Sequence, residues 1–587
     1  MKRTILLLLA AVFFVGAQAT NVAQKAAGSE QPPPDYLIIC ANDFWDVAVE
    51  WGRYRTETGR RTHVSSLANI ATDMGKESVN LVDLKKFIKG KQGGDKPTEG
   101  FQVLLIGDCP TDGSEGYDAK TQIPWFMSTY KDAFERSTIP GDNYLADQVG
   151  EDNEIPDLAI GRIPAKTAAQ AKMALAKVQT YEKAKLGEWS RRLTFFAGEG
   201  RFGAAVDQML ENLFTQMAEQ VIDPAYDLRM TYANIKSPYA YVPSKFSDKV
   251  IEEANQGAMI LSYMGHGAPD RLDDMHVPQG EGKRDVRYPI LTAEDVAKFK
   301  IEEGKLPVMI IVACATGFMD GKDDCISERI CFTEKAPVAI VSSNRDSHPY
   351  SNTLLQNAMI TEITKNRRVT LGEAFLRAKR EIVLGEDKNR KNLETMAQFI
   401  IPKKSERDKL NRAHLYLYNL IGDPGLKLRH SNSEVKCLTR KAVATLGQSF
   451  STKFSFAPAL PIAKGSGPFV GDATVEAHLE VRRSQVASAL QPFTAADLIS
   501  TDAAKRKAAE DAVASNHAAA NTKWVCKGEL MGSVMPGDQS VLEEVTVEIK
   551  IDEALAPGDY VVKLFALDSK GQHCGFAALK LQVIAKE

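Results

Sequence analysis

The sequence lacks the features that would place it among disulfide-rich, nucleic-acid-binding or membrane-spanning proteins. Eight cysteines in 587 residues are too few for a disulfide scaffold, and which of them pair is left open. A net charge of −3 and an isoelectric point near 6.4 give no electrostatic reason to expect nucleic acid or an anionic membrane as partner. No segment reaches about 20 consecutive apolar residues. The remaining composition, 44% hydrophobic and 25% charged, is that of a globular protein of about two to four domains.

The amino terminus predicts export. Lys2-Arg3 precedes an apolar run from Ile5 to Val15, and Ala17-Gln18-Ala19 fits the small-x-small cleavage rule. We therefore expect residues 1–19 to be a signal peptide, and the mature protein to be secreted, on the cell surface or periplasmic. Residues 20–34 are polar, end in three prolines and indicate a flexible lead-in.

From residue 35 to about 430, short apolar strands alternate with amphipathic helices. This alternation predicts an α/β domain with a parallel-rich sheet sandwiched by helices, divided into subdomains 35–190 and 191–430. We expect the last strand to run from His414 to Leu420 into the turn Gly422-Asp423-Pro424.

Beyond residue 430 the pattern changes to short alternating segments such as Thr474 to Val481 and Tyr560 to Phe565. This pattern predicts an antiparallel β-sandwich over 431–587. An Ala-, Lys- and Asp-rich segment near 494–520 indicates an inserted, exposed helix.

Two apolar strands end in residues that can perform chemistry together. Val308 to Ala313 delivers Cys314, and a second strand beginning at Ala258 ends in His266 between two glycines. Open α/β sheets place their reactive groups at the carboxyl ends of strands. Taken alone, Cys314 is more often a core cysteine, and His266 more often a loop or core histidine. Together they form the pair that cysteine-nucleophile catalysis needs.

Four motifs resemble the gingipain family, the caspase-like cysteine endopeptidases of secreting bacteria. The resemblance covers roughly residues 35–429 and implies that the His-bearing and Cys-bearing strands are neighbours in one caspase-like sheet. It also implies that the tail is the immunoglobulin-like β-sandwich that commonly follows. The motifs are Tyr263-Met-Gly-His-Gly267, Ala313-Cys-Ala-Thr-Gly317, Asp157-Leu-Ala-Ile-Gly-Arg162 and Ile421-Gly-Asp-Pro424.

The resemblance implies roles for particular residues. Cys314 is the expected nucleophile and His266 its proton acceptor and donor, with Asp157 at the position of the His-orienting carboxylate. Asp157 is equally interpreted as a cap or as a partner of Arg162. The N–H groups of Gly267 and Cys314 are expected to hold the tetrahedral oxyanion.

Substrate selection is expected around Met264, Asp346 and Tyr350. The family builds its S1 pocket from the residue two before the catalytic His and from the loop that holds Asp346 and Tyr350. Tyr350 is expected to stack on a long P1 side chain, and Asp346 to pair with a basic one, although the adjacent Arg345 complicates that pairing. Cleavage after basic residues is therefore a hypothesis.

The sequence requires no cofactor and no metal. Family resemblance implies Ca²⁺, and Asp112, Asp142 and Asp147 are candidate ligands, but their spacing matches no calcium loop and favours a solvated acidic loop. Asp108 and Asp423 each follow a strand and a glycine, which favours a role in turns.

The sequence thus predicts an exported cysteine endopeptidase acting on proteins or peptides through an acyl-enzyme. Two alternatives stay open. One is a sortase-like transpeptidase of a secretion system, which transfers the acyl group to an amine. The other is a non-catalytic surface-binding homologue.

Overall fold

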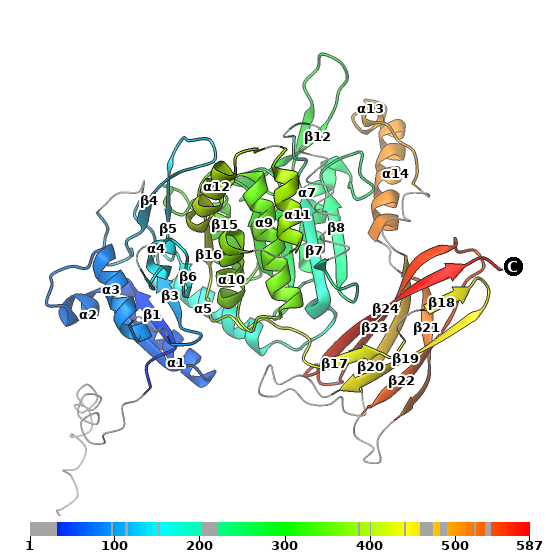
Figure 1. The fold of residues 1–587 in the computed structure, drawn as a ribbon. Coiled ribbons are helices and arrows are strands. Elements are labelled where there is room, and N and C mark those ends of the chain that lie inside the picture. Colours follow the sequence, from blue (N-terminus) through cyan, green and yellow to red (C-terminus); the bar gives the residue numbers. More distant parts are fainter. Residues whose placement is uncertain are drawn as a thin grey trace, which may run out of the picture.

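The structure is a computed structural model, and Figure 1 shows its fold as a ribbon. The expected signal peptide 1–19 and residues 20–31 of the lead-in lie outside the described residues. The model describes residues 32–94, 98–111, 116–150, 153–201, 203, 221–385, 388–399, 401–439, 442–457, 473–481, 490–521, 524–534 and 542–586.

A ten-stranded sheet forms the centre of the larger domain. Its inner strands are continuous apolar runs: all five residues of the strands Tyr36–Cys40, Gln102–Ile106 and Val308–Val312 are buried. Strands buried on both faces require helices on both sides of the sheet. In spatial order the strands are β2 (Thr62–Ser66), β1 (Tyr36–Cys40), β3 (Gln102–Ile106), β6 (Ala159–Ile163), β16 (Tyr418–Ile421), β15 (Ala339–Ser343), β14 (Val308–Val312), β9 (Ile260–Met264), β7 (Arg192–Ala197) and β8 (Asp227–Tyr232).

The sheet consists of two parallel halves that run in opposite directions. β16 is parallel to β6 but antiparallel to β15, so the reversal lies between β16 and β15. β16 comes late in the chain but runs parallel to the strands of the first half. The division into 35–190 and 191–430 stays a prediction.

Helices cover the sheet, and their ends are set by local sequence. Thr167, for example, accepts the Gln170 N–H and forms a capping box at the start of α5. The helices are α1 (Trp45–Glu57), α2 (Leu67–Asp73), α3 (Leu81–Gln92), α4 (Asn143–Ala146), α5 (Ala168–Lys183), α7 (Phe246–Asn255), α8 (Ile326–Cys331), α9 (Pro349–Ile360), α10 (Leu371–Leu384), α11 (Lys388–Ala397) and α12 (Lys404–Leu417). Helices α9 to α12 lie together over the face of the sheet that is nearest the viewer in Figure 1.

The last strand of this domain differs from the prediction. Residues 404–417 form α12, so only Tyr418–Ile421 is a strand. The apolar run from Leu415 therefore serves the end of a buried helix and the start of a strand, and periodicity over so short a run does not separate the two.

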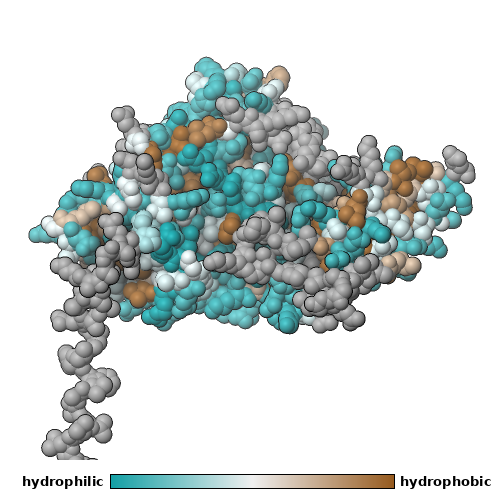
Figure 2. All heavy atoms as spheres, turned by 60° about the horizontal axis from the view of Figure 1, so that its bottom comes forward, coloured by the Kyte–Doolittle hydropathy of each residue, from teal (hydrophilic) through white to brown (hydrophobic). Residues whose placement is uncertain are grey.

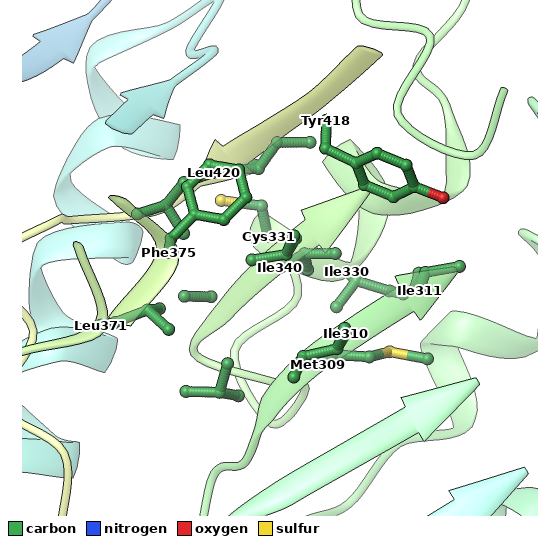
Figure 3. Close-up of a cluster of buried hydrophobic side chains, with 14 of the residues drawn as sticks. Met309, Ile310, Ile311, Ile330, Cys331, Ile340, Leu371, Phe375, Tyr418 and Leu420 are labelled. Atoms are coloured by element: carbon green, nitrogen blue, oxygen red, sulfur yellow. The ribbon is translucent and has the colours of Figure 1, made fainter. Parts of the chain in front are cut away.

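The strand that precedes Cys314 is fully buried in the core of the α/β domain. Met309, Ile310 and Ile311 of β14 are buried beside Ile340 of β15, and Phe375 of α10 belongs to the same cluster (Figure 3). Core side chains at interior packing density have little freedom. The backbone that delivers Cys314 is therefore held rigidly.

Two of the motif residues have structural roles at the other half of the sheet. Asp423, fully buried, accepts hydrogen bonds from Tyr36 Oη (2.5 Å), Trp51 Nε1 (2.5 Å) and the Arg55 guanidinium (2.6 and 2.9 Å). It also accepts the Gly425 N–H, which gives it the turn role that the sequence favours. Arg162 is likewise fully buried and forms a bidentate pair with Asp142.

The carboxyl-terminal domain is an eight-stranded sheet that curls around its own core. Neighbouring strands are antiparallel except β18 and β24. Its buried centre includes Phe454, Leu479, Val547 and Val562. Its strands are β17 (Glu434–Cys437), β18 (Ala442–Thr445), β19 (Ser449–Ala457), β20 (Thr474–Val481), β21 (Trp524–Val534), β22 (Glu544–Lys550), β23 (Gly558–Leu567) and β24 (Cys574–Ile584). The predicted parallel-rich sheet followed by a β domain is confirmed.

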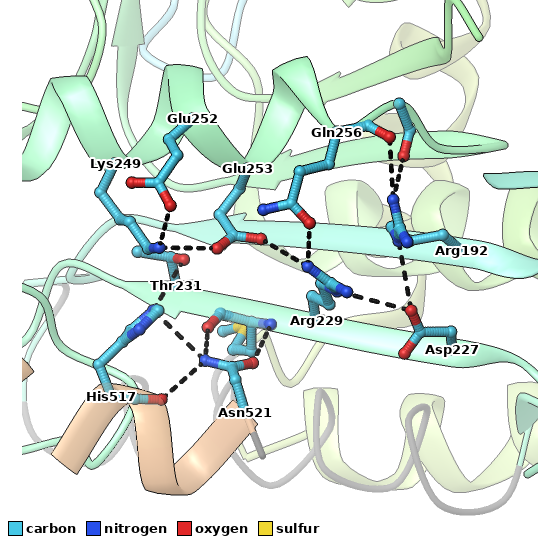
Figure 4. A network of polar contacts seen from close by, with 12 residues as sticks. Arg192, Asp227, Arg229, Thr231, Lys249, Glu252, Glu253, Gln256, His517 and Asn521 are labelled. Atoms are coloured by element: carbon cyan, nitrogen blue, oxygen red, sulfur yellow. Dashed lines mark hydrogen bonds and ion pairs between the residues drawn. The ribbon is translucent and has the colours of Figure 1, made fainter. Parts of the chain in front are cut away.

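The helix inserted in this domain is not simply exposed. α14 (Ala503–Asn521), preceded by the short α13 (Ala495–Leu498), packs against β8 at the edge of the central sheet. His517 contacts Thr231, and Asn521 exchanges hydrogen bonds with the backbone of Met230 (Figure 4). The insertion thus links the β domain to the α/β domain.

The surface and the cysteines agree with the composition. The face shown in Figure 2 is mainly hydrophilic, with small separate apolar areas. Among the described residues, no helix has the length and hydropathy needed to cross a membrane. All eight cysteines lie in the described part of the chain, and each is unpaired.

Candidate active site

Adjacent strands bring Cys314 and His266 to the same edge of the sheet. β14 and β9 are parallel neighbours, and Val312 lies in register with Met264. Cys314 lies two residues after Val312, and His266 lies two residues after Met264. They therefore leave the sheet side by side, as expected for neighbouring strands.

Gly267 brings the His-bearing segment against the backbone of the cysteine. A Cβ atom on Gly267 would lie 2.7 Å from Thr316 Cγ2, and 2.9 Å from both Ala313 Cβ and the Cys314 carbonyl oxygen. These separations are shorter than van der Waals contact, so a side chain would push the two segments apart. The glycine lets this segment lie against the backbone of Cys314, and the oxyanion role of its N–H stays a prediction.

The position of the His266 ring is set by the loop that follows β7. His266 Nε2 lies 2.5 Å from the carbonyl oxygen of Gly200, and Tyr263 Oη donates to the His266 carbonyl (2.8 Å). A carbonyl oxygen only accepts, so Nε2 carries a hydrogen, and in the neutral ring Nδ1 holds the lone pair. This tautomer makes Nδ1 the nitrogen that can take a proton from a thiol.

Asp273 is a carboxylate near His266 that sequence reasoning missed. Burial raises the pKa of Asp273, and the charge of His266 counteracts this. Asp273 Oδ2 is buried without a hydrogen-bond partner among the described residues. Asp273 lies between two short hairpins, β10 (Gly267–Ala268) with β11 (Arg271–Leu272) and β12 (Asp274–Val277) with β13 (Val286–Pro289). No motif or periodicity in the sequence marks it.

The structure does not bring Asp157 to His266. Asp157 precedes β6, which is separated from β9 by β16, β15 and β14, or roughly 19 Å at the usual strand spacing. Its carboxylate accepts the Gln148 and Val149 N–H groups (3.0 and 2.8 Å) and lies 3.5 Å from Arg380. The orienting role is therefore corrected: Asp157 caps a loop, one of the two readings that the sequence left open.

Cys314 is half-buried, and its sulfur contacts Ser347 in the loop that follows β15. Its sulfur accepts the Ser347 N–H (3.4 Å), lies 3.9 Å from Ser347 Oγ, and donates to the Ser347 carbonyl (3.6 Å). Burial raises the pKa of Cys314; the Ser347 N–H lowers it in part, and the charges of Asp346 and Asp132 add to the rise. The resting group is thus a thiol that needs a base.

The turn after the cysteine is unusual in its backbone. Ala315 has φ of 51°, in the left-handed region, and its N–H donates to the Arg345 carbonyl (3.0 Å). A non-glycine residue in this region is uncommon and costs about 1 kcal/mol or more. The sharp turn leaves the Cys314 side chain at the tip of the strand.

A buried polar cluster behind the cysteine holds Ser347. Asn352 Nδ2 donates to Ser347 Oγ (2.8 Å), and Tyr418 Oη donates to Asn352 Oδ1 (2.7 Å). His414 Nε2 accepts the His348 N–H (3.2 Å), and burial lowers the pKa of His414 to about 3. The loop that contacts Cys314 is therefore anchored by neutral side chains of α9, α12 and β16.

Two carboxylates lie beside this loop. Asp346 is 26% exposed and pairs with the exposed Arg136 at 3.6 Å. Burial and the nearby Asp132 raise the pKa of Asp346. Asp132 closes the hairpin of β4 (Phe126–Lys131) and β5 (Thr138–Gly141), where it accepts the N–H groups of Arg136 and Ser137. The cysteine thus faces a locally negative region.

The other expected pocket residues differ in position. Met264 ends β9 and is partly exposed beside the site. Arg345 forms a buried ion pair with Asp320 (2.7 and 2.8 Å), and its charge offsets only part of the rise in the pKa of Asp346. Tyr350 is only 6% exposed, and its hydroxyl donates to Glu394 of α11 (3.4 Å). The expected stacking of Tyr350 on a substrate does not fit this burial.

Two of the three candidate calcium ligands have other partners. Asp142 is neutralised by Arg162, Asp147 accepts the Glu154 N–H, and Asp112 lies outside the described residues. Among the described residues, no group of three or more His, Cys, Asp or Glu side chains is arranged to hold a metal ion. Asp142 and Asp147 do not fit Ca²⁺, and the calcium implied by resemblance remains an untested expectation.

The structure places a thiol and an imidazole on neighbouring strand ends of a caspase-like sheet. A family profile described as peptidase family C25 matches residues 29–429, well over half of the chain. The chain belongs to peptidase family C25, the gingipain family. It is accordingly a cysteine-type peptidase, and its substrates are proteins.

Two solved structures found by the comparison share little sequence with this chain. The crystal structure of the Arg-specific cysteine proteinase gingipain R has a TM-score of 0.48 and 15% identity, and covers 95% of this chain and 99% of its own. The complex of Porphyromonas gingivalis RgpB pro- and mature domains has a TM-score of 0.47 and 14% identity, covering 94% and 100%. No curated protein matches this chain.

Proposed function

We propose that the protein is an exported endopeptidase in which Cys314 and His266 cleave peptide bonds through an acyl-enzyme. The observation that supports this most directly is the register of β9 and β14, together with the close approach of Gly267 to Cys314. Both reactive groups leave neighbouring strands at the same level.

The chemistry follows from the protonation states. Cys314 Sγ attacks the scissile carbonyl carbon while its proton passes to His266 Nδ1. The C–N bond then breaks, and the imidazolium returns the proton to the leaving amine. Water, deprotonated by His266, releases the acyl group. The N–H groups of Gly267 and Cys314 are the candidate oxyanion donors, each worth about 3 kcal/mol of barrier.

We further propose that the protein prefers a basic P1 side chain. Asp346 supports this, because its carboxylate is close enough to raise the pKa of Cys314, and its partner Arg136 is 71% exposed and held at 3.6 Å. A substrate Arg or Lys can displace an exposed, weakly held arginine at little cost. Met264 provides an apolar wall for the stem of such a side chain.

Product analysis tests the reaction. Purified protein incubated with a peptide library should give new carboxyl termini after Arg and Lys, and alkylation of Cys314 should stop their appearance. An added amine nucleophile should leave most product as free acid. If aminolysis products dominate, transpeptidation replaces hydrolysis.

Asp346→Asn tests the P1 preference. The variant should lose about tenfold in the ratio of kcat/KM for Arg over Leu at P1, while Leu substrates change little. Asp248→Asn, at an exposed carboxylate on α7, is the matched control. An unchanged ratio in Asp346→Asn removes the proposed pocket.

A further inference from the structure

The hairpin of β4 and β5 borders the nucleophile on the side away from His266. Its Ala133 N–H donates to the Asp346 carbonyl oxygen (3.0 Å). The next residue, Ser347, donates its N–H to Cys314 Sγ (3.4 Å). β15, which precedes this loop, flanks β14 on the side opposite β9. The tip of the hairpin and the cysteine are therefore joined through two consecutive residues of one loop.

Hydrogen bonds and an ion pair hold the tip of the hairpin in place. The Asp132 carboxylate accepts the N–H groups of Phe134 and Arg136 (3.1 and 2.9 Å), which closes the turn. Glu135 has φ of 58°, in the left-handed region, and pairs with Lys409 of α12 (2.9 Å). The side chains of the tip are thus presented on a preorganised backbone, which lowers the entropy cost of binding to them.

Phe134 lies on this tip beside the carboxylate proposed to select P1. Its side chain is 56% exposed. The guanidinium carbon of Arg136 lies 4.7 Å from the centre of the Phe134 ring, and Arg136 Nη1 lies 3.6 Å from Asp346 Oδ2. A single exposed apolar side chain is ordinary on a protein surface. Phe134 differs because one exposed arginine connects its ring to the carboxylate next to the nucleophile.

The proposed chemistry decides which part of a substrate crosses this surface. His266 returns its proton to the leaving amine, so the residues after the scissile bond lie on the β9 side of Cys314. The residues before that bond therefore lie on the β15 side, over the Asp346 loop and the hairpin. In an extended peptide the P1 and P3 side chains share one face, about 7 Å apart. The Arg136 guanidinium spans a similar separation between Asp346 and Phe134.

We infer that Phe134 is the contact surface of an S3 subsite that takes a large apolar side chain of the substrate. The inference rests on the proposed peptidase function and on P1 binding at Asp346. When a basic P1 side chain displaces Arg136 from Asp346, the arginine can also leave the Phe134 ring, and the P3 side chain packs in its place. This contact removes two apolar surfaces from water, which favours binding.

Hydrolysis of a P3 series tests the inference. Peptides with Arg at P1 and either Phe or Ser at P3 are compared on wild type, and wild type should favour P3 Phe at least fivefold in kcat/KM. Phe134→Ser should reduce this ratio below twofold, whereas Phe134→Leu, which keeps an apolar surface, should retain most of it. Leu530→Ser, at an exposed residue of β21 in the β domain, is the matched control and should keep the wild-type ratio. Thermal unfolding shows that each variant is folded.

Binding without turnover separates the subsite from the proposed reaction. Fluorescence anisotropy of the same peptides, labelled, on Cys314→Ala protein should show at least fivefold tighter binding of the P3 Phe peptide, and adding Phe134→Ser should abolish the difference. Equal binding of the two peptides, or a preference that survives in folded Phe134→Ser protein, would overturn the inference. The binding preference without any hydrolysis by wild type would uphold the subsite and overturn the proposed reaction alone.

Discussion

At the scale of single residues, the site combines a protonated thiol with nearby negative charge. Burial, Asp346 and Asp132 all raise the pKa of Cys314. A preformed thiolate is therefore disfavoured, and deprotonation must accompany attack. A positively charged substrate side chain near Asp346 would cancel part of this effect, which links substrate choice to reactivity.

Asp346→Asn should make the resting thiol more reactive. Removing a negative charge near the sulfur lowers the pKa of Cys314, so the thiolate fraction at pH 7 to 8 rises. Alkylation by iodoacetamide, followed against pH, should show its midpoint shifted to lower pH. A midpoint unchanged or moved upward would show that the carboxylate does not act on the sulfur.

Asn352→Ala should impair catalysis more than binding. Asn352 donates a hydrogen bond to Ser347 Oγ, and the Ser347 N–H donates to the sulfur of Cys314. Loosening this contact misplaces the nucleophile, so we expect kcat to fall about tenfold with KM nearly unchanged. Asn357→Ala on the same helix is the control. A change confined to KM would contradict the positioning role.

At the scale of elements, the sequence predicts where strands lie in the chain better than it predicts which segments contact them. The runs before Cys314 and His266 are continuous and apolar, so both strands and their exposed ends follow from pattern alone. The contacts of His266 do not, because Gly200 and Asp273 lie on loops whose positions depend on tertiary packing. The expected position of Asp157 beside His266 is wrong for the same reason. Its motif marks a strand but does not show which strands lie next to it.

His414 on α12 should make the protein sensitive to acid. Its pKa of about 3 lies below the unfolded value near 6.5, so the unfolded state binds more protons between these limits. Stability is therefore present above pH 6.5 and falls as pH decreases, by roughly 1.4 kcal/mol per pH unit at most. Denaturant unfolding of His414→Gln should show a shallower loss between pH 6.5 and 4.5. An identical slope would exclude His414 as the cause.

Asp423→Ala should destabilise the α/β domain strongly. It leaves Arg55 buried with one carboxylate fewer and removes the acceptor of Tyr36 and Trp51. Breaking a buried pair costs about 3–5 kcal/mol. Chemical unfolding should show this loss, whereas Asp248→Asn should change stability by less than about 0.5 kcal/mol. A small effect would mean that the contacts of Asp423 with Arg55, Tyr36 and Trp51 do not stabilise the domain.

At the scale of the whole molecule, the division into an α/β part and a β part is visible in the sequence. The reversal of strand direction between β15 and β16 is not, because it depends on which distant strand β16 joins. The docking of α14 on β8 is hidden for a similar reason: its few buried residues, such as Val513 and His517, lie in an Ala-rich segment that resembles an exposed helix.

The central claim is that Cys314 is the nucleophile and His266 its base. The most direct measurement is kcat/KM for peptide hydrolysis by wild type, Cys314→Ala, His266→Ala and the control Cys437→Ala, with thermal unfolding of each. We predict that the first two variants lose at least about 10³-fold while remaining folded, and that the control keeps its activity. A folded Cys314→Ala or His266→Ala protein with wild-type turnover would contradict the account.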